Sequence, residues 1–173
     1  MQDRIIENGQ QQTSSTQRLQ WLALVGFLVV AAAAGFVGNL VQGDAVAEQY
    51  LAFDRPAWAP PQSAFGIVWP ALYVLIGIAG WLTWRTAGGF RPAAVALSLW
   101  GTQLVVNAVW PGVFFGLEAL GPAIGVIVLL DIVVIATIVA TARISRIAAW
   151  LLVPYLLWIS YATGLNIAIF AMN

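Results

Sequence analysis

The fold is decided by the stretch 120–142, LGPAIGVIVLLDIVVIATIVATA, in which Asp131 is the only ionisable residue. An α-helix rises about 1.5 Å per residue, so about 20 apolar residues cross the roughly 30 Å of hydrocarbon in a bilayer. Transmembrane β-strands are about half as long and alternate in polarity, which this stretch does not do. The stretch therefore predicts a membrane-spanning helix.

Four further apolar stretches of similar length occur in the chain, at about 21–41, 65–84, 92–110 and 147–171. The composition agrees, because 61% of the 173 residues are hydrophobic and 8% are charged, whereas globular proteins carry about 25% charged residues. We predict an all-α integral membrane bundle of five transmembrane helices over residues 21–173. The polar tail over residues 1–20 is predicted to be disordered.

The first apolar stretch has a competing interpretation. Arg18, an apolar core and the small residues 31–34 imitate a signal peptide with its cleavage site. The apolar run continues as far as Val41, however, and the polar segment before it is long. These features favour a retained span.

The arginines separate into two groups along the predicted spans. One side of the membrane holds the N-terminal tail and the connections after the second and fourth spans, with Arg4, Arg18, Arg85, Arg91, Arg143 and Arg146. The other side holds only Arg55, together with four acidic residues. The positive-inside rule then predicts a cytoplasmic N-terminus and an outward C-terminus.

Several classes of site are excluded by residue types that the chain lacks. It contains no Cys and no His, which removes disulfides, thiolate zinc sites, iron–sulfur clusters and Ser-His-Asp chemistry. Its net charge of zero leaves no basic surface for nucleic acid. We expect no metal site and no bound cofactor, and the expected surroundings are membrane lipid.

The one long connection covers residues 42–64. Its first part predicts a short helix that begins at Asp44, and its second part is stiffened by Pro56, Pro60 and Pro61. A rigid loop above one end of a helical bundle is a candidate lid, and we expect Trp58 to pack downward over the mouth of a cavity.

Aromatic and amide residues recur at helical spacing on three of the predicted spans. The three stripes are Phe65, Trp69 and Tyr73; Asn107, Trp110 and Phe114; and Tyr155, Trp158, Ala162 and Asn166. They indicate either a shared aromatic cavity or a tryptophan-rich packed core. The two Asn amides must find partners inside the protein, from a ligand, from each other or from backbone.

Asp131 is the only ionisable residue deep inside a predicted span. An intramembrane acid is by default a candidate for a proton relay, an ion site or a counter-ion. A structural role, with the carboxyl group bonded to Tyr, Trp or backbone groups of a neighbouring helix, is the alternative. The chain offers no intramembrane basic residue to pair with it.

The motifs together resemble the translocator protein family (TspO/MBR, tryptophan-rich sensory protein). The resemblance is carried by four blocks in family order: Trp58-Ala-Pro-Pro61, Phe65-Gly-Ile-Val-Trp69 with Leu72-Tyr73, Asn107-Ala-Val-Trp110-Pro111 with Phe114-Phe115-Gly116, and Pro154-Tyr-Leu-Leu-Trp158 with Ala162-Thr-Gly-Leu-Asn166. It departs at Arg55, where the family commonly has Lys, and at Ala59, where animal members have His. Sterol binding is poorly supported, because no Tyr followed closely by Lys or Arg occurs after the last span.

The resemblance implies a five-helix membrane protein that binds porphyrins of the protoporphyrin IX type, with a regulatory or porphyrin-degrading role in tetrapyrrole metabolism. It assigns ligand contact, and light- and oxygen-dependent porphyrin breakdown, to Trp69 and Trp158. The other ligand-binding positions that it implies are Trp58, Phe65, Tyr73, Asn107, Trp110, Phe114, Ala162 and Asn166. Porphyrin would be ligand or substrate, and the residues themselves form no catalytic constellation.

Two further interpretations concern transport and assembly. A transporter of porphyrins or other small apolar ligands is the alternative function, although five spans do not divide into two equal inverted halves. A homodimer is expected, because Ala94, Ser98 and Gly101 form a ridge of small residues on which helices can approach closely. Gly121 and Gly125 offer a rival surface for the same contact, and packing within one chain explains both sets of small residues equally well.

Overall fold

The computed structural model describes the backbone of residues 2–42 and 46–173, and the side chains of residues 17–41 and 49–173. These residues form helices and connecting turns without any strand, as the sequence predicted. In chain order the elements are α1 (Gln2–Gln42), α2 (Val46–Ala52), α3 (Gln62–Ala87), α4 (Ala94–Pro111), the π-helical turn η1 (Gly112–Gly116), α5 (Leu120–Ala142) and α6 (Arg146–Met172). The helix start expected at Asp44 lies outside the described residues.

Four helical segments are long and apolar enough to cross a membrane: Gln17–Val41 within α1, and the whole of α3, α5 and α6. They match four of the predicted spans. The remaining one, at 92–110, corresponds to α4, which is 18 residues long and carries the polar residues Thr102, Gln103 and Asn107. The described helices therefore establish a helical membrane protein with four candidate spans.

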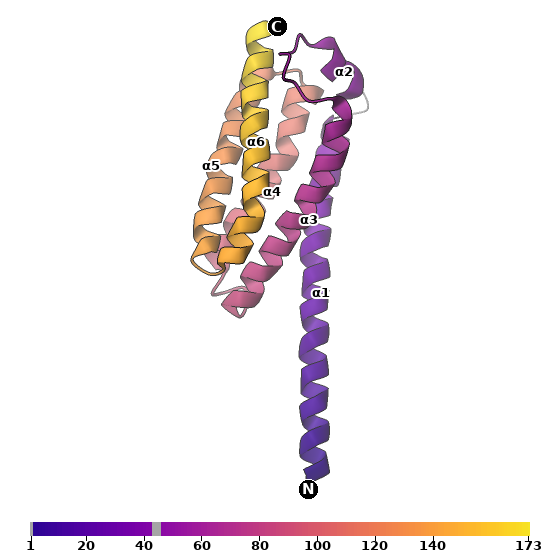
Figure 1. The fold of residues 1–173 in the computed structure, drawn as a ribbon, viewed down its shortest axis with the longest axis vertical. Coiled ribbons are helices and arrows are strands. Elements are labelled where there is room, and N and C mark those ends of the chain that lie inside the picture. Colours follow the sequence, from indigo (N-terminus) through magenta and orange to yellow (C-terminus); the bar gives the residue numbers. More distant parts are fainter. Residues whose placement is uncertain (1, 43–45) are drawn as a thin grey trace.

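The long helices pack side by side (Figure 1). Helix α5 lies between α4 and α6, α3 packs against α6, and α1 closes the bundle against α3 and α4. The α3–α4 and α5–α6 connections lie at the end of the bundle nearer the N-terminus, whereas α2 and the C-terminus lie at the other end (Figure 1). We refer to these as the lower and the upper end.

The chain differs from the sequence prediction in its N-terminal segment. A disordered tail was expected over residues 1–20, whereas α1 extends back to Gln2 and projects beyond the lower end of the bundle (Figure 1). Gln, which occurs six times in residues 1–20, and Arg, which occurs twice, are good helix formers. Adding residues to an existing helix also avoids the unfavourable nucleation step.

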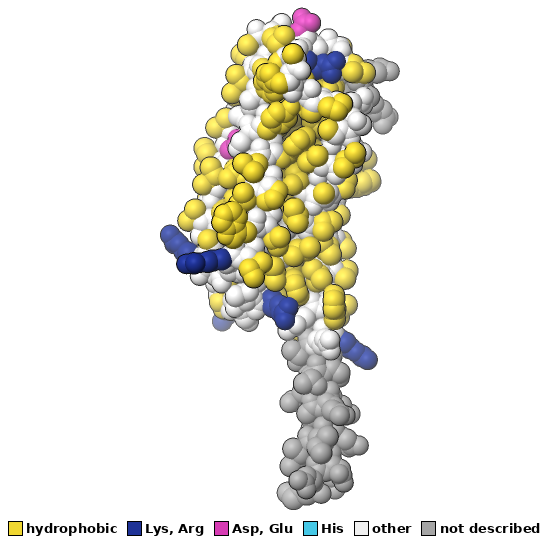
Figure 2. All heavy atoms as spheres, in the orientation of Figure 1, with side chains coloured by type: hydrophobic (Ala, Val, Ile, Leu, Met, Phe, Trp, Pro, Cys, Tyr) yellow, Lys and Arg dark blue, Asp and Glu magenta, His cyan; other side chains and the backbone are white. Residues whose placement is uncertain are grey.

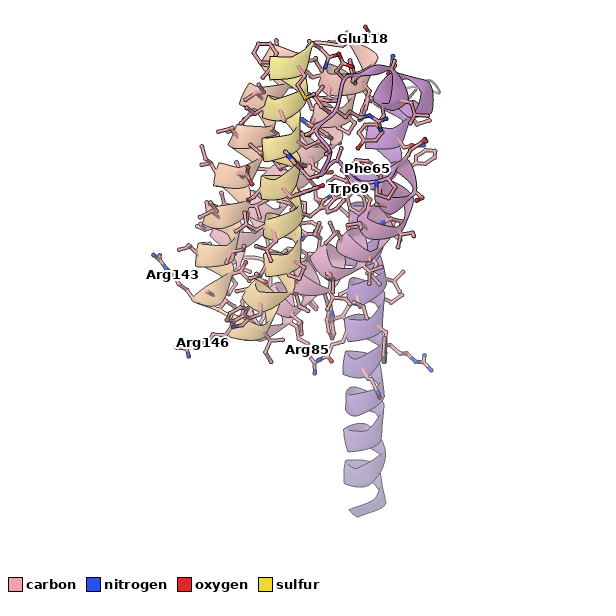
Figure 3. The ribbon with its side chains drawn as sticks, turned by 45° about the horizontal axis from the view of Figure 1, so that its top comes forward. Phe65, Trp69, Arg85, Glu118, Arg143 and Arg146 are labelled. Atoms are coloured by element: carbon pink, nitrogen blue, oxygen red, sulfur yellow. The ribbon has the colours of Figure 1, made fainter. Side chains whose placement is uncertain are left out.

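Charge and apolar surface separate along the bundle axis. Apolar side chains cover the visible flank, and basic side chains gather at its lower edge (Figure 2). Arg85, Arg143 and Arg146 lie at the lower end, whereas Glu118 lies at the upper end (Figure 3). The residues of the small ridge, Ala94 and Ser98, are exposed on α4, and the dimer stays a prediction.

Glycines of α3 let α1 approach closely in the lower half of the bundle. A Cβ placed on Gly77 would lie 2.9 Å from Leu28 Cδ2. One placed on Gly80 would lie 2.8 Å from Phe27 Cδ1 and 2.8 Å from the Trp100 indole nitrogen. That indole donates a hydrogen bond to Ile76 O at 2.9 Å, so its ring is fixed. Packing at Gly80 therefore tolerates no larger residue.

Replacing Gly80 by Ala should lower the free energy of unfolding by about 1–3 kcal/mol, since overpacking forces the two aromatic rings to shift. The matched control is Gly164→Ala on α6, where an added Cβ meets nothing within 4 Å and helix propensity adds up to about 1 kcal/mol of stability. Thermal unfolding in detergent measures both. Equal melting temperatures for the two variants would contradict this packing.

Candidate functional site

A cavity of about 1090 Å³ lies between α1, α3 and the upper end of α4, next to α2. Phe65 and Trp69 of α3 mark its level in the upper half of the bundle (Figure 3). Its walls are mostly apolar and aromatic. Helix α1 contributes Leu28, Ala32, Gly35, Phe36, Gly38 and Asn39, and α2 contributes Tyr50. Helix α3 contributes Gln62, Ser63, Phe65, Gly66, Trp69, Pro70, Tyr73 and Val74. The remaining lining residues are Asn107, Trp110 and Pro111 of α4 and Phe115 of η1.

One amide joins three helices at the wall of this cavity. Tyr73 of α3 donates its hydroxyl proton to Asn107 Oδ1 of α4 at 2.6 Å. Asn107 Nδ2 in turn donates to the Tyr155 hydroxyl oxygen of α6 at 3.0 Å. Asn107 and Tyr155 are buried. Trp69 stacks on the Tyr73 ring at 5.7 Å, so the same network also orients the cavity tryptophan.

The second buried amide, Asn166 of α6, supports the wall from behind. Its Oδ1 accepts a hydrogen bond from the Trp110 indole at 3.2 Å, and its Nδ2 donates to Leu120 O at 3.2 Å. Trp110 also stacks on Phe114, with ring centroids 5.2 Å apart. The two amides left open by the sequence thus have separate partners, and Asn166 fixes a cavity residue without lining the cavity.

The structure brings together five of the ten predicted ligand-binding residues in the cavity wall: Phe65, Trp69, Tyr73, Asn107 and Trp110. Phe114, Ala162 and Asn166 are buried behind that wall. Trp158 also stands behind it, with its ring 5.8 Å from Phe65, and its indole N–H is buried without a partner among the described residues.

Trp58 does not pack downward over the cavity as the sequence suggested. Its side chain is 51% exposed and lies edge-on against Tyr161 of α6, with ring centroids 5.6 Å apart. It is absent from the cavity wall. The direction of a loop side chain depends on contacts far along the chain, here over about 100 residues, which a local motif does not specify.

The sequence analysis missed the contribution of α1 and of Tyr50. Six residues of α1 line the cavity, and Gly35 faces the Tyr73 ring so closely that a Cβ there would collide with it. The available signal was the small-residue segment 31–34, which resembled a cleavage site, together with the Gly35 that follows it. Its small side chains instead leave space beside α3.

The loop 53–61 is held over the upper end of the bundle by several contacts. The Tyr50 hydroxyl donates to Pro60 O at 2.7 Å, and the Arg55 guanidinium lies 4.7 Å above the Tyr50 ring. Burial raises the pKa of the Tyr50 hydroxyl, although Arg55 opposes the shift. The hydroxyl therefore keeps its proton, and its bond to Pro60, at physiological pH.

Three more contacts tie the loop and α2 to distant elements. Tyr161 donates its hydroxyl proton to Trp58 O at 2.8 Å. The Asp54 amide and carbonyl both bond the Asn173 side chain at 3.0 Å, and Gln49 Nε2 donates to Glu118 Oε1 at 3.2 Å. Helix α2 and the loop 53–61, which we call the roof, are thus attached at α6 and at the α4–α5 connection. Of the described roof residues, Tyr50 lines the cavity.

Asp131 takes no part in the cavity wall. Its two carboxylate oxygens lie 3.1 Å from Ser160 Oγ and 2.7 Å from Thr163 Oγ1, both on α6. The partners of its carboxyl group are therefore Ser and Thr hydroxyls, and not the Tyr, Trp or backbone groups that the sequence analysis considered. The contact joins α5 to α6.

Comparison with known sequences gives one consistent result. A sequence profile described as the TspO/MBR family matches residues 27–172. The chain is 36% identical over 155 residues to a translocator protein of Homo sapiens, covering 88% of this chain and 91% of that protein. It is 38% identical over 154 residues to a tryptophan-rich protein TspO of Archaeoglobus fulgidus, covering 88% and 97%.

A tryptophan-rich sensory protein of Cereibacter sphaeroides is 32% identical over 155 residues, covering 90% of this chain and 94% of that protein. The profile match runs from Phe27 in α1 to the end of α6. The similarity therefore includes every helix that contributes to the cavity.

The Tyr73–Asn107 bond should contribute measurably to stability. In a double-mutant cycle of Tyr73→Phe and Asn107→Ala, we expect a coupling of about 0.6 kcal/mol and at most about 1.7 kcal/mol, as for other hydrogen bonds between membrane helices. Thr102→Val is the control on α4, because Thr102 is exposed and its hydroxyl bonds only Ser98 O of the same helix. Unfolding in mixed micelles measures all variants, and strict additivity would show that the bond contributes nothing.

Proposed function

The chain belongs to the TspO/MBR family, and on this premise we propose that it binds tetrapyrroles of the protoporphyrin IX type in the cavity between α1, α3 and α4. The observation that supports this most is the combination of size and lining. Small-molecule sites usually measure about 300–1,000 Å³, and this one, at about 1090 Å³ with a mainly aromatic and aliphatic wall, has room for a macrocycle.

The cavity offers the contacts that a flat apolar ring needs. Indole and phenol rings stack on π-systems in offset geometry, each pair contributing about 1 kcal/mol beyond simple burial. Trp69 is the leading stacking partner, because it lines the cavity and is oriented by Tyr73. The chain has no His or Cys, the common axial ligands of haem iron, so metal-free porphyrin suits the site at least as well as haem.

The role that follows from binding is regulatory in this proposal. Two relatives are named for sensing and for translocation, and both activities begin with capture of a ligand. Pigment breakdown would need aromatic electron donors against the porphyrin. Trp69 meets this condition, whereas Trp158 reaches the ligand only through Phe65.

Titration of tryptophan fluorescence with protoporphyrin tests the binding site. Saturable quenching is expected, and Trp69→Phe should weaken binding about fivefold, since loss of about 1 kcal/mol corresponds to that factor. Trp150→Phe is the matched control, because Trp150 is 72% exposed at the lower end and does not line the cavity. Equal affinities of the two variants for protoporphyrin would contradict binding in this cavity.

We also propose that α4 is a fifth span and that the lower end faces the cytoplasm. The α3–α4 and α4–α5 connections lie at opposite ends of the bundle (Figure 1), which supports a spanning α4. Its buried amide finds partners on α3 and α6, as polar residues inside membranes require. The arginine-rich lower end supports the orientation through the positive-inside rule.

Single cysteines placed in the cysteine-free chain test this topology. Thr86 and Leu117 are both exposed and lie before and after α4. Thr86→Cys should react with a membrane-impermeant maleimide only from the cytoplasmic side, and Leu117→Cys only from the opposite side. Labelling of both variants from the same side would show that α4 does not cross the membrane.

A further inference from the structure

The cavity has its mouth in the flank of the bundle. Eight of its lining residues are also exposed on the outside. Three of them are polar and lie at the upper edge, and the other five are apolar or glycine: Ala32 and Phe36 of α1, and Gly66, Pro70 and Val74 of α3. Phe36 is 63% exposed and Val74 is 50% exposed. The opening therefore lies between α1 and α3, on an apolar surface.

The depth of the mouth follows from helix geometry. Ala32 and Phe36 lie about 14 Å and about 8 Å below Val41, the upper limit of the α1 span, at about 1.5 Å per residue. Gly66 and Val74 lie about 6 Å and about 18 Å below Gln62, where α3 begins. This places the mouth at the depth of the hydrocarbon in one leaflet.

The upper edge of the mouth is polar. Asn39, Gln62 and Ser63 line the cavity there and are exposed. They lie at the upper limits of the α1 and α3 spans, which is the level of the lipid headgroups. A ligand in this site therefore meets an apolar wall along its body and polar side chains at one end.

The seam between α1 and α3 is closed below and open above. Below, Gly77 and Gly80 bring α3 into contact with Leu28 and Phe27. Above, Pro70 interrupts the backbone hydrogen bonding of α3 at the mouth itself, and an interior proline kinks or loosens a helix. Figure 1 shows α3 inclined to α1, consistent with a seam that is not uniform along its length.

The roof contributes Tyr50 to the upper end of the cavity. Tyr50 is buried and packs edge-on against Phe65, with ring centroids 5.3 Å apart. The loop 53–61 is attached through Tyr161, and α2 through the contact between Gln49 and Glu118. Displacement of the roof would break these contacts, whereas the exposed lining residues of the flank, such as Phe36 and Gly66, form none of them.

We propose that the cavity is loaded sideways from the bilayer, through the seam between α1 and α3, by membrane-dissolved amphiphiles that have a flat apolar body and a polar end group. The loop 53–61 acts as a fixed roof, and the gate is the mouth framed by Phe36 and Gly66. This inference rests on the proposed function, because it assumes a ligand in the cavity. It adds the source of that ligand and its route.

The test compares two exposed helical glycines, one at the mouth of the cavity and one away from it. Gly66 lies at the mouth and Gly164 is exposed on α6 away from the cavity, and an added Cβ meets nothing within 4 Å at either. In proteoliposomes mixed with vesicles that contain protoporphyrin, stopped-flow quenching of tryptophan fluorescence gives association and dissociation rates. Gly66→Phe should slow both about tenfold, and Gly164→Phe should leave both unchanged.

Two further variants separate the mouth from the roof. Phe36→Ala widens the mouth and should accelerate association and dissociation alike, which keeps the test decisive if Phe at position 66 fills the cavity. The double variant Tyr161→Phe/Glu118→Ala removes two roof contacts and should leave both rates unchanged. Faster exchange in this double variant, or wild-type rates in Gly66→Phe and Phe36→Ala, would overturn the lateral route.

The equilibrium measurement distinguishes failure of the route from failure of the function. If the wild type binds saturably and the mouth variants have the same association and dissociation rates as the wild type, only lateral loading is contradicted. No saturable quenching by the wild type, in vesicles or in detergent, contradicts the proposed function and the route with it.

Discussion

The structure depends on one amide, that of Asn107. In hydrocarbon a polar group that finds no partner costs several kcal/mol, so the amide must bond within the protein. It does so with Tyr73 and Tyr155, which belong to two other helices. Helices α3, α4 and α6 are thereby fixed at one level, and Trp69, stacked on Tyr73, is fixed beside the cavity. The polar residue that weakens the apolar character of α4 is also the residue that attaches α4 to its neighbours.

Helix α1 is held by different physics. Near the lower end the Trp81 indole of α3 donates to Gln20 O of α1 at 3.1 Å. Further up, the contacts of α1 depend on shape, with Phe27 and Leu28 against the α3 glycines and Gly38 against Ala108. Between membrane helices, where lipid tails are as apolar as the protein, such contacts hold only where backbones approach closely. Gly35 is in contact with the Tyr73 ring of α3, and around this contact the small residues of α1, Ala32 among them, leave the space that the cavity occupies.

The parts of this site that the sequence predicted are those fixed by the period of a single helix. Phe65, Trp69 and Tyr73 had to share one face of α3, and Asn107 and Trp110 one face of α4, and all five line the cavity. The parts that it did not predict depend on how two elements meet. Trp158 has the right spacing but lies behind Phe65, Trp58 turns outward to Tyr161, and the contribution of α1 follows from its angle to α3, which no local pattern encodes.

Helices α3 to α6 are joined by a hydrogen-bond network, whereas α1 packs beside them largely through shape. This difference explains why the cavity opens sideways, next to α1. The hydrogen bonds of Asn107 and Asn166 join α3, α4, α5 and α6. The roof contacts hold α2 and the loop 53–61 at the upper end, because loop backbone and polar side chains near water can bond one another. The seam between α1 and α3 borders the cavity, and below its polar upper edge the exposed lining residues are apolar or glycine. Apolar side chains can face lipid without leaving any hydrogen-bonding group unsatisfied. The packing that creates the cavity can therefore also leave it open to the membrane at this seam.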